Sequence, residues 1–355
     1  MSFSLKTRIG ALLIDGPRYI YYLTRSRFGS KDAWLLVKNR HQQLEISNDP
    51  LGIKCHWSWT SDLYLPSVFP SIGQRLFAKA LSTFSFELQT SQINTETTPD
   101  VSFIIGHRGS ARTQLLLKTI ESIAAQQQCI VECIVVEQDS QPVMRKQLPA
   151  WVKYVFTPTD DPKMPYSRSW AFNVGAEHAN SSCLIFHDND LLVPRDYAYQ
   201  TLKLVEKGFD FVNLKRFIFY LSESATQEIL NNGRIEPSLK VDSIMQNAEG
   251  GGSIGACKKA YFKIGGFDQR FVGWGGEDNE FWERAQTQSV WPYANLALIH
   301  LWHGPQKEKL DIECSATQVL YNKLSTQEPL DRIKWLIQNQ LREPKDGPSN
   351  KMWKN

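Results

Sequence analysis

The sequence has neither a metal-binding cysteine pattern nor an apolar run long enough to span a bilayer. Its six cysteines, at positions 55, 129, 133, 183, 257 and 314, form no CxxC pair and no zinc-type spacing. Cys133 and Cys183 lie in apolar runs typical of buried strands, so we interpret them as inert core thiols, which favours a reducing compartment. The N-terminus also lacks the apolar core of a signal peptide. We therefore expect a cytoplasmic protein, which could lie at the inner face of a membrane.

Net charge is low as well. The chain carries 40 Lys and Arg against 37 Asp and Glu, and a net charge of +3 gives no reason to expect nucleic acid as a partner. The charge is unevenly placed, because the first forty residues contain eight basic side chains and only two acidic ones, Asp15 and Asp32. A basic, partly apolar segment can rest on an anionic membrane surface, although a solvated N-terminal subdomain is an equally good interpretation. Residues 1–40 are thus a candidate for peripheral membrane contact.

Strand and helix patterns alternate along the chain after residue 98. Short apolar runs typical of buried strands lie at 101–105, 130–136, 152–156 and 183–186, and helical spacing at 116–128 and 167–179. This alternation predicts an α/β fold with a parallel sheet and right-handed crossovers. Ligands bind such sheets at the carboxyl ends of the strands. We therefore expect the site at the loops that begin with His107, Glu137 and Asp188.

The first acidic cluster is Asp188-Asn189-Asp190, which directly follows an apolar strand run. Two carboxylates held rigidly at a strand end suit Mg²⁺ or Mn²⁺ bridging a diphosphate. An Asp-x-Asp triplet can also be a simple turn or a helix cap. The strand before it and a helix expected to open at Pro194 favour the metal interpretation.

The second cluster is the run Gly-Trp-Gly-Gly-Glu-Asp at residues 273–278. Its glycines allow the backbone to approach a ligand closely, and Trp274 offers a flat face on which a sugar ring can stack. Glu277 and Asp278 supply carboxylates where a general base is needed to deprotonate a hydroxyl. The alternative is a glycine-rich turn with an acidic helix start.

A third candidate is the pair His300 and His303, which follows another strand-like run. One of these histidines could complete a metal site begun by the aspartates. Residues three apart on a strand point to opposite faces, so the spacing predicts a single histidine ligand. We favour His303, with His300 as the alternative.

These motifs resemble those of a known family. Residues 101–305 resemble the GT-A fold of nucleotide-sugar glycosyltransferases, a Rossmann-like, mostly parallel sheet flanked by helices. The first half is similar to the bacterial inverting glycosyltransferases that include chondroitin polymerases. Residues 250–284 resemble the carboxyl-terminal domain of the β-1,4-galactosyltransferases, whose Gly-Trp-Gly-Gly-Glu-Asp hallmark is intact here.

The resemblance implies a role for each matching residue. Asp190 would bind the metal, Mn²⁺ or Mg²⁺, together with Asp188 and His303. Asp278 would be the catalytic base, and the acceptor sugar would contact Glu277, Trp274, Gly275 and Gly276. The remaining residues would bind the donor: His107, Arg108, Glu137, Asp139, Arg168, Asn173, Asp188 and Asn189. The second strand ends in Glu-Gln-Asp-Ser rather than the Asp-Asp-Gly-Ser of the wider bacterial family, which leaves the uracil contact open among positions 137, 138 and 139.

The same resemblance implies the domain organisation. It predicts an N-terminal extension at 1–98, a GT-A domain at 99–305 and a helical extension at 306–355. The GT-A domain would divide into a nucleotide-sugar-binding half, 99–215, and an acceptor-binding half, 216–305.

The implied activity is metal-dependent, inverting transfer of a hexose or N-acetylhexosamine. The donor would be a UDP-sugar and the acceptor a saccharide or a lipid-linked saccharide, in surface polysaccharide or glycan synthesis. One alternative is a retaining N-acetylgalactosaminyltransferase, a family with a similar Trp-Gly-Gly-Glu run but Asn in place of Asp278. Another is a non-catalytic carbohydrate-binding protein on the same fold. A Rossmann dehydrogenase is disfavoured because no GxGxxG follows the first strand.

Overall fold

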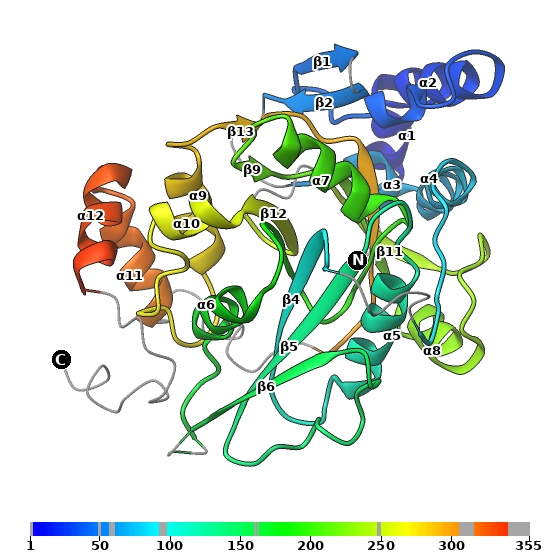
Figure 1. Ribbon diagram of the computed structural model, residues 1–355. Coiled ribbons are helices and arrows are strands. Elements are labelled where there is room, and N and C mark those ends of the chain that lie inside the picture. The colour runs from blue at the N-terminus through cyan, green and yellow to red at the C-terminus, as the bar shows by residue number, and fades with distance from the viewer. Residues whose placement is uncertain are drawn as a thin grey trace.

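The computed structural model describes residues 3–48, 51–56, 61–91, 98–159, 161, 163–246, 250–304 and 316–339. Two large sheets lie at the centre of this part of the chain, and helices cover them (Figure 1). A separate two-stranded hairpin lies at the periphery. None of the helices within these ranges is long and apolar enough to cross a membrane.

The larger sheet has seven strands in the order β13-β9-β12-β7-β4-β5-β6. They are β4 (Val101–His107), β5 (Val131–Asp139), β6 (Lys153–Pro158), β7 (Cys183–His187), β9 (Phe211–Val212), β12 (Ser253–Cys257) and β13 (Val290–Trp291). The four strands from β7 to β6 are parallel, and β12 runs antiparallel to both of its neighbours. The predicted mostly parallel sheet is confirmed, and all four predicted strands belong to it.

Helices cover both faces of this sheet. They are α5 (Thr113–Ala124), α6 (Arg168–His178), α7 (Tyr197–Glu206), α9 (Lys258–Lys263) and α10 (Glu277–Ala285). Because side chains alternate along a strand, Phe103 of β4 packs in the core with α5 and α7, whereas Ile104 packs in the core with α6, α9 and α10. Figure 1 shows α5 and α6 on opposite sides of β4. The predicted α/β class with flanking helices is therefore correct.

The second sheet has five strands in the order β3-β11-β10-β14-β8. They are β3 (Ser61–Asp62), β8 (Leu191–Leu192), β10 (Lys215–Leu221), β11 (Val241–Gln246) and β14 (Leu296–His300). Three helices lie near it: α3 (Tyr64–Val68), α4 (Pro70–Thr83) and α8 (Glu223–Asn232). Residues of α4 such as Phe77 share one hydrophobic core with Phe219 of β10, so part of the N-terminal extension packs directly on this sheet.

The two large sheets join at residues 188–190. β7 ends at His187 in the seven-stranded sheet, and β8 begins at Leu191 in the five-stranded one. The short β8 pairs with β14, with Leu191 opposite His300. The helix expected to open at Pro194 begins instead at Tyr197, because β8 and a turn occupy the intervening residues.

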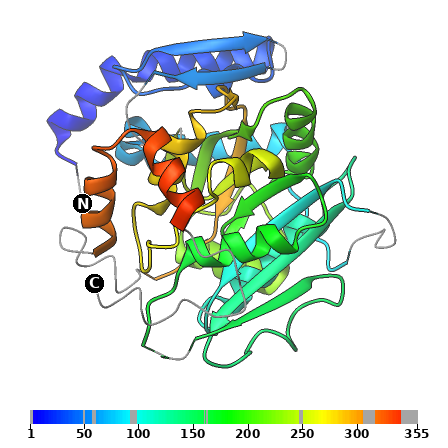
Figure 2. The ribbon, with the colours of Figure 1, turned by 60° about the vertical axis from the view of Figure 1, so that its left-hand side comes forward.

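The remaining elements lie at the periphery. They are α1 (Leu5–Ile14), α2 (Gly16–Phe28), the 3-10 helix η1 (Ala33–Leu36), β1 (Leu44–Asn48), β2 (Leu51–Cys55), α11 (Ala316–Leu324) and α12 (Pro329–Asn339). The hairpin and the first helices form one edge of the molecule (Figure 2). Arg332 of α12 donates to Glu280 and Glu283 of α10, so the C-terminal helices pack against the helix that begins at Glu277.

Candidate active site

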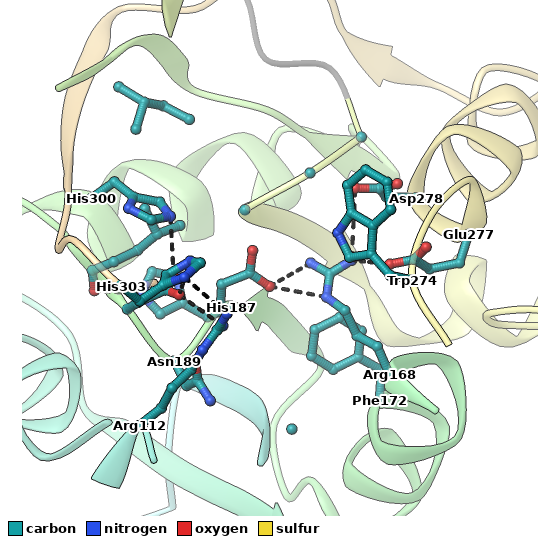
Figure 3. A pocket seen from close by; sticks show the side chains of 18 of the residues that line it. Arg112, Arg168, Phe172, His187, Asn189, Trp274, Glu277, Asp278, His300 and His303 are labelled. Atoms are coloured by element: carbon teal, nitrogen blue, oxygen red, sulfur yellow. Dashed lines mark hydrogen bonds and ion pairs between the residues drawn. The ribbon is translucent and has the colours of Figure 1, made fainter. Parts of the chain in front are cut away.

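A cavity of about 430 Å³ lies where the two large sheets join. Two groups of side chains face each other across it (Figure 3). We name them the histidine wall (Arg112, Asp190, His300 and His303) and the carboxylate wall (Trp274, Glu277 and Asp278). Arg168, from the first turn of α6, lies between them.

The histidine wall is assembled from three segments that are distant in sequence. Asp190 Oδ2 lies 3.4 Å from His303 Nε2, and Asp190 Oδ1 lies 3.7 Å from His300 Nε2. The pairing of β8 with β14 brings His300 beside the aspartate. His303 follows three residues after β14 ends, so the strand period that predicted opposite faces does not apply to it. The structure therefore brings both histidines to Asp190, where one was expected.

The donor atoms of the histidine wall fit a divalent ion. One carboxylate and two imidazoles offer ligand atoms that all lie within 4.8 Å of one another. Adjacent ligands of an octahedral ion at about 2.1 Å are about 3 Å apart, so these three atoms would draw closer together on binding an ion and leave its other positions open. Burial leaves His300 Nδ1 with no hydrogen-bond partner among the described residues, and the ring stacks on Tyr220 at 4.3 Å. Among the described residues, His300 therefore has its Nε2 toward Asp190 and nothing bonded to Nδ1.

His303 Nδ1 has two close neighbours, an acceptor and a donor, which require different protonation states of that nitrogen. It lies 2.7 Å from the carbonyl oxygen of Gly304 and 3.1 Å from Arg112 Nη2. The shorter contact favours a proton on Nδ1 that is donated to Gly304, which leaves the Nε2 lone pair facing Asp190. Metal-binding histidines commonly donate their other ring N–H to a carbonyl in this way.

Arg112 is a member of this wall that the sequence did not indicate. Its Nη1 donates to Asp190 Oδ2 over 3.1 Å, and it lies at the start of α5. Burial alone would raise the pKa of Asp190, but His300, Arg112 and His303 together hold that pKa below its ordinary value. Asp190 is therefore kept ionised, as a metal ligand must be.

Arg168 forms ion pairs with Asp188 and with both acids of the carboxylate wall. Its Nε and Nη2 donate to Asp188 Oδ1 over 2.9 and 2.6 Å, and its Nη1 lies 3.3 Å from Glu277 and 3.8 Å from Asp278. The Ser167 hydroxyl caps α6 and accepts from Trp170 N–H, which fixes the helix start that carries Arg168. Asp188 was predicted as a metal ligand, but its carboxylate pairs with Arg168. The ligand atoms that lie within 4.8 Å of one another belong to Asp190, His300 and His303.

The carboxylate wall lies at the N-terminus of α10. Gly276 is the N-cap with φ of +86°, and a Cβ there would lie 2.8 Å from Tyr321 Cβ, so a larger residue would strain the turn and clash. The buried Arg284 of the same helix donates to Glu280 Oε2 at 2.6 Å and to the carbonyls of Ile264 and Gly266. These bonds tie α10 to the segment before the glycine run. The glycine run and this buried pair together fix Glu277 and Asp278 at the edge of the cavity.

The two carboxylates of this wall lie close enough to influence each other. Burial, with the neighbouring charge of Asp278, raises the pKa of Glu277 to about 7 despite Arg168. Trp274 lies beside Arg168 and Asp278 on the cavity lining. The Trp274 carbonyl accepts a hydrogen bond from Thr317 of α11. The wall therefore offers one buried carboxyl group, one more exposed carboxylate and an aromatic face.

Several predicted donor residues lie together at the ends of β4 and β5, next to the cavity lining. Asn189 lines the cavity, and its Nδ2 lies 3.1 Å from Nδ1 of His107. The Gly109 N–H donates to Asp139 Oδ2. Arg108 Nη1 donates to the Met164 carbonyl. We name Asn189, His107, Arg108 and Asp139 the polar edge. Within it His107 is fully buried, and Asn189 is the member that lines the cavity.

The three positions left open for the uracil contact differ in burial. Glu137 is fully buried and accepts from Met144 N–H and Tyr154 hydroxyl, and Gln138 is fully buried and accepts from Ser167 N–H. Asp139 is half-buried at the end of β5. Of the three, Asp139 is the one whose side chain is not fully buried.

Other predicted residues lie outside the cavity lining. Asn173 is buried, donates to the Phe267 carbonyl and accepts from Phe267 N–H, so it ties α6 to the segment before the glycine run. Gly275 and Gly276 shape the turn without lining the cavity. The predicted cluster therefore separates into residues that face the cavity and residues that support it.

Comparison with known proteins gives a family match and several similar proteins for this chain. Residues 102–297 match the family described as glycosyltransferase like family 2. The chain is 30% identical over 126 residues to β-1,4-galactosyltransferase 5 of Danio rerio, covering 34% of this chain and 27% of that protein. It is 29% identical over 147 residues to human β-1,4-galactosyltransferase 6, covering 40% and 32%. The chain thus spans about a quarter to a third of the length of these relatives.

A solved structure is similar at a lower level. The mannosyltransferase PcManGT from Pyrobaculum calidifontis, in complex with GDP-Man and Mn²⁺, is 14% identical with a TM-score of 0.44, covering 75% of this chain and 77% of that one. The family match covers more than half of the chain, so the chain belongs to glycosyltransferase like family 2. The resemblance to chondroitin polymerases stays a prediction.

Proposed function

We propose that this protein is a metal-dependent inverting glycosyltransferase that moves a hexose or N-acetylhexosamine from a UDP-sugar to a saccharide or lipid-linked saccharide. The observation that carries the proposal is the opposition of the two walls across one cavity. Asp190 and two histidines lie on one side, and Glu277 and Asp278 lie on the other. The similarity to β-1,4-galactosyltransferases supports transfer of a hexose, and the UDP carrier is our assignment from the resemblance of the motifs.

On the histidine wall, Asp190, His300 and His303 would hold a divalent cation. When bound, that ion supplies positive charge to the diphosphate leaving group. Two imidazole ligands favour Mn²⁺ over Mg²⁺, which prefers oxygen ligands and retained water. The Arg112 guanidinium, 3.1 Å from Asp190, would add a second positive charge where the leaving group becomes more negative.

On the carboxylate wall, Asp278 would act as the general base. The acceptor oxygen forms a bond to the anomeric carbon as the bond from that carbon to the diphosphate oxygen breaks, and the hydroxyl proton passes to Asp278. Attack from the face opposite the leaving group inverts the carbon, so an α-linked donor gives a β-linked product. Glu277 would hold a second acceptor hydroxyl, and Trp274 would pack against the sugar ring.

The donor's nucleotide would lie along the polar edge at the ends of β4 and β5. Asp139 is the position we assign to the uracil contact, with Arg108 beside the base. His107 is fully buried and would act indirectly, by holding Asn189. Arg168 and Asn189 both line the cavity, and we assign them to contacts with the transferred sugar. Asn173 would act indirectly, by holding α6 in place.

A panel of UDP-sugars tests this proposal. Each sugar is incubated with the protein, a set of saccharide acceptors and either Mn²⁺ or EDTA, and the product's anomeric configuration is read by NMR. We expect transfer that requires the metal and yields a β-linkage. Activity unaffected by EDTA would reject the metal site, and an α-linked product would reject the single displacement and favour the retaining alternative. Binding of a saccharide without turnover of any donor would favour a non-catalytic protein.

A further inference from the structure

The first two helices present an unusual surface. Nine of the sixteen large apolar side chains exposed in the described ranges lie between Phe3 and Phe28. The most exposed are Leu5 at 75%, Leu13 at 70% and Phe28 at 79%. Exposed apolar residues scattered singly are ordinary, but a concentration of this kind marks a surface that meets a partner.

These helices are anchored to the domain, so the exposure is not that of a frayed terminus. Ala11 of α1 and Tyr19 of α2 are buried in the core shared with α4 and β10. At the end of α2 the Ser26 hydroxyl donates to the Lys31 carbonyl, and Lys79 of α4 reaches the Ser26 carbonyl. The inner sides of α1 and α2 are thus fixed, and none of the described parts of the chain covers their apolar outer sides.

The exposed residues follow helical spacing. In α1 they include Leu5, Ile9 and Leu12, a spacing of i, i+4 and i+7, and in α2 they include Ile20 and Phe28, which are eight residues apart. Each helix therefore carries an outward apolar stripe. We give the name N-terminal face to the exposed basic residues and large apolar residues of the two helices: Leu5, Lys6, Arg8, Ile9, Leu12, Leu13, Ile14, Ile20, Tyr21, Arg25, Arg27 and Phe28.

Only positive charge accompanies these apolar residues. Residues 1–31 contain six basic side chains and a single acid, Asp15. That acid is buried and its Oδ2 pairs with Arg40 Nη2 at 2.7 Å, so it does not offset the exposed basic groups. Both views show these helices at the edge of the molecule (Figures 1 and 2).

We propose that the N-terminal face binds the surface of an anionic lipid bilayer. Its apolar side chains would enter the boundary between headgroups and acyl chains, and its basic side chains would contact lipid phosphates. With 10 and 13 residues, α1 and α2 are each too short to span a bilayer, so they lie in its surface. A second copy of the chain fits less well, because a two-fold contact through this face would bring like charges together.

The proposal does not rest on sugar transfer, and lipid binding alone tests it. The full-length protein is sedimented with vesicles of neutral phosphatidylcholine, or with vesicles containing phosphatidylglycerol, at low and high salt. We expect binding to the anionic vesicles that weakens as salt screens the charges. Absence of binding, or equal binding to both vesicle types, would overturn the proposal.

Substitutions locate the contact. Leu13→Ser, Ile20→Ser and Phe28→Ser together should weaken partitioning roughly a hundredfold, because three exposed apolar side chains no longer enter the bilayer. The matched control makes the same change at three exposed apolar residues of α11 and α12, Val319, Leu330 and Ile337. It should bind like the parent, and equal loss in both triple variants would contradict the assignment.

A charge series separates the two components. Lys6→Gln, Arg25→Gln and Arg27→Gln should reduce affinity for anionic vesicles about a hundredfold. Lys146, Lys207 and Lys259, which are exposed elsewhere, provide the matched control. All these side chains are exposed, so thermal melts should match the parent. If instead the protein forms dimers that the Leu13, Ile20 and Phe28 changes dissociate, the occupant is a second copy and the proposal is wrong.

Discussion

The two walls of the cavity hold their carboxylates in opposite electrostatic settings. Asp190 of the histidine wall has Arg112 and two imidazoles around it, which keep its pKa below the ordinary value despite burial. Glu277 of the carboxylate wall has Asp278 beside it, and burial with that neighbour raises its pKa to about 7. One wall thus keeps its buried carboxylate ionised beside a possible cation, whereas the other holds a buried carboxyl group, Glu277, with a pKa of about 7.

The walls also differ in how they are built. The histidine wall depends on the junction of two sheets, where the two-residue β8 pairs with the end of β14. The carboxylate wall depends on one local feature, a glycine run that leads into α10 and is held from behind by Arg284. Changes in either wall should therefore affect separate steps, and the predictions below test that separation.

The largest effect is expected from Asp278→Asn. Removing a general base slows transfer by about 10²- to 10⁴-fold, while UDP binding with Mn²⁺ should change by less than about twofold because the histidine wall is intact. The measurement is kcat for transfer together with UDP affinity. Asp242→Asn, an exposed carboxylate on β11, is the matched control and should leave both unchanged. A transfer rate close to that of the parent would remove Asp278 from the role of base.

The next effect concerns the two histidines. His300→Ala and His303→Ala should each weaken Mn²⁺ binding by roughly 10- to 100-fold or more, since outer partners of a metal site already contribute that much. Electron paramagnetic resonance of free Mn²⁺ measures the affinity. His178→Ala, at the exposed end of α6, is the control. Loss in only one of the two variants would reduce the site to a single histidine.

Glu277 should make stability depend on pH. Its pKa of about 7 lies above the ordinary 4.5, so between these values the folded protein keeps a proton that the unfolded chain releases. The stability that the protonated Glu277 contributes to the folded state is fully present below about pH 4.5 and is lost as the pH rises through 7. Relative to Glu277→Gln, the parent's free energy of unfolding should fall by on the order of 1–3 kcal/mol between pH 5 and 8. Urea unfolding of both proteins across that range provides the measurement, and parallel curves would show that Glu277 is ionised throughout.

The smallest effect is expected at Trp274. Trp274→Ala removes an aromatic face worth about 0.5–1.5 kcal/mol, so the acceptor KM should rise roughly 2- to 10-fold while donor KM stays constant. Trp335→Ala, an exposed tryptophan on α12, is the matched control. A change in donor KM alone would move Trp274 from the acceptor to the donor side.

The sequence predicted the carboxylate wall more completely than the histidine wall for a physical reason. Residues 273–278 are contiguous, so glycine, aromatic and acid could be identified together. Arg112 reaches Asp190 only because of how α5 follows β4, and no local pattern indicates it. Both histidines meet Asp190 through the pairing of β8, a strand too short to show periodicity.

The same distinction holds for the fold. The parallel strands β4, β5, β6 and β7 are apolar runs and were all predicted. The five-stranded sheet was not, because its edge pairs residues far apart in sequence, such as Ser61 of β3 with Gln246 of β11. Asn173 was assigned to the donor through the helix that contains it, but its side chain turns to Phe267 instead of the cavity.

The separation of the two walls is tested most directly by calorimetric titration of UDP with Mn²⁺ into Asp190→Asn and Asp278→Asn. We predict that Asp190→Asn weakens Mn²⁺-dependent UDP binding by about a hundredfold or more, whereas Asp278→Asn binds like the parent. Equal affinity in the two variants would contradict the division of the cavity into a metal and donor wall and an acceptor wall.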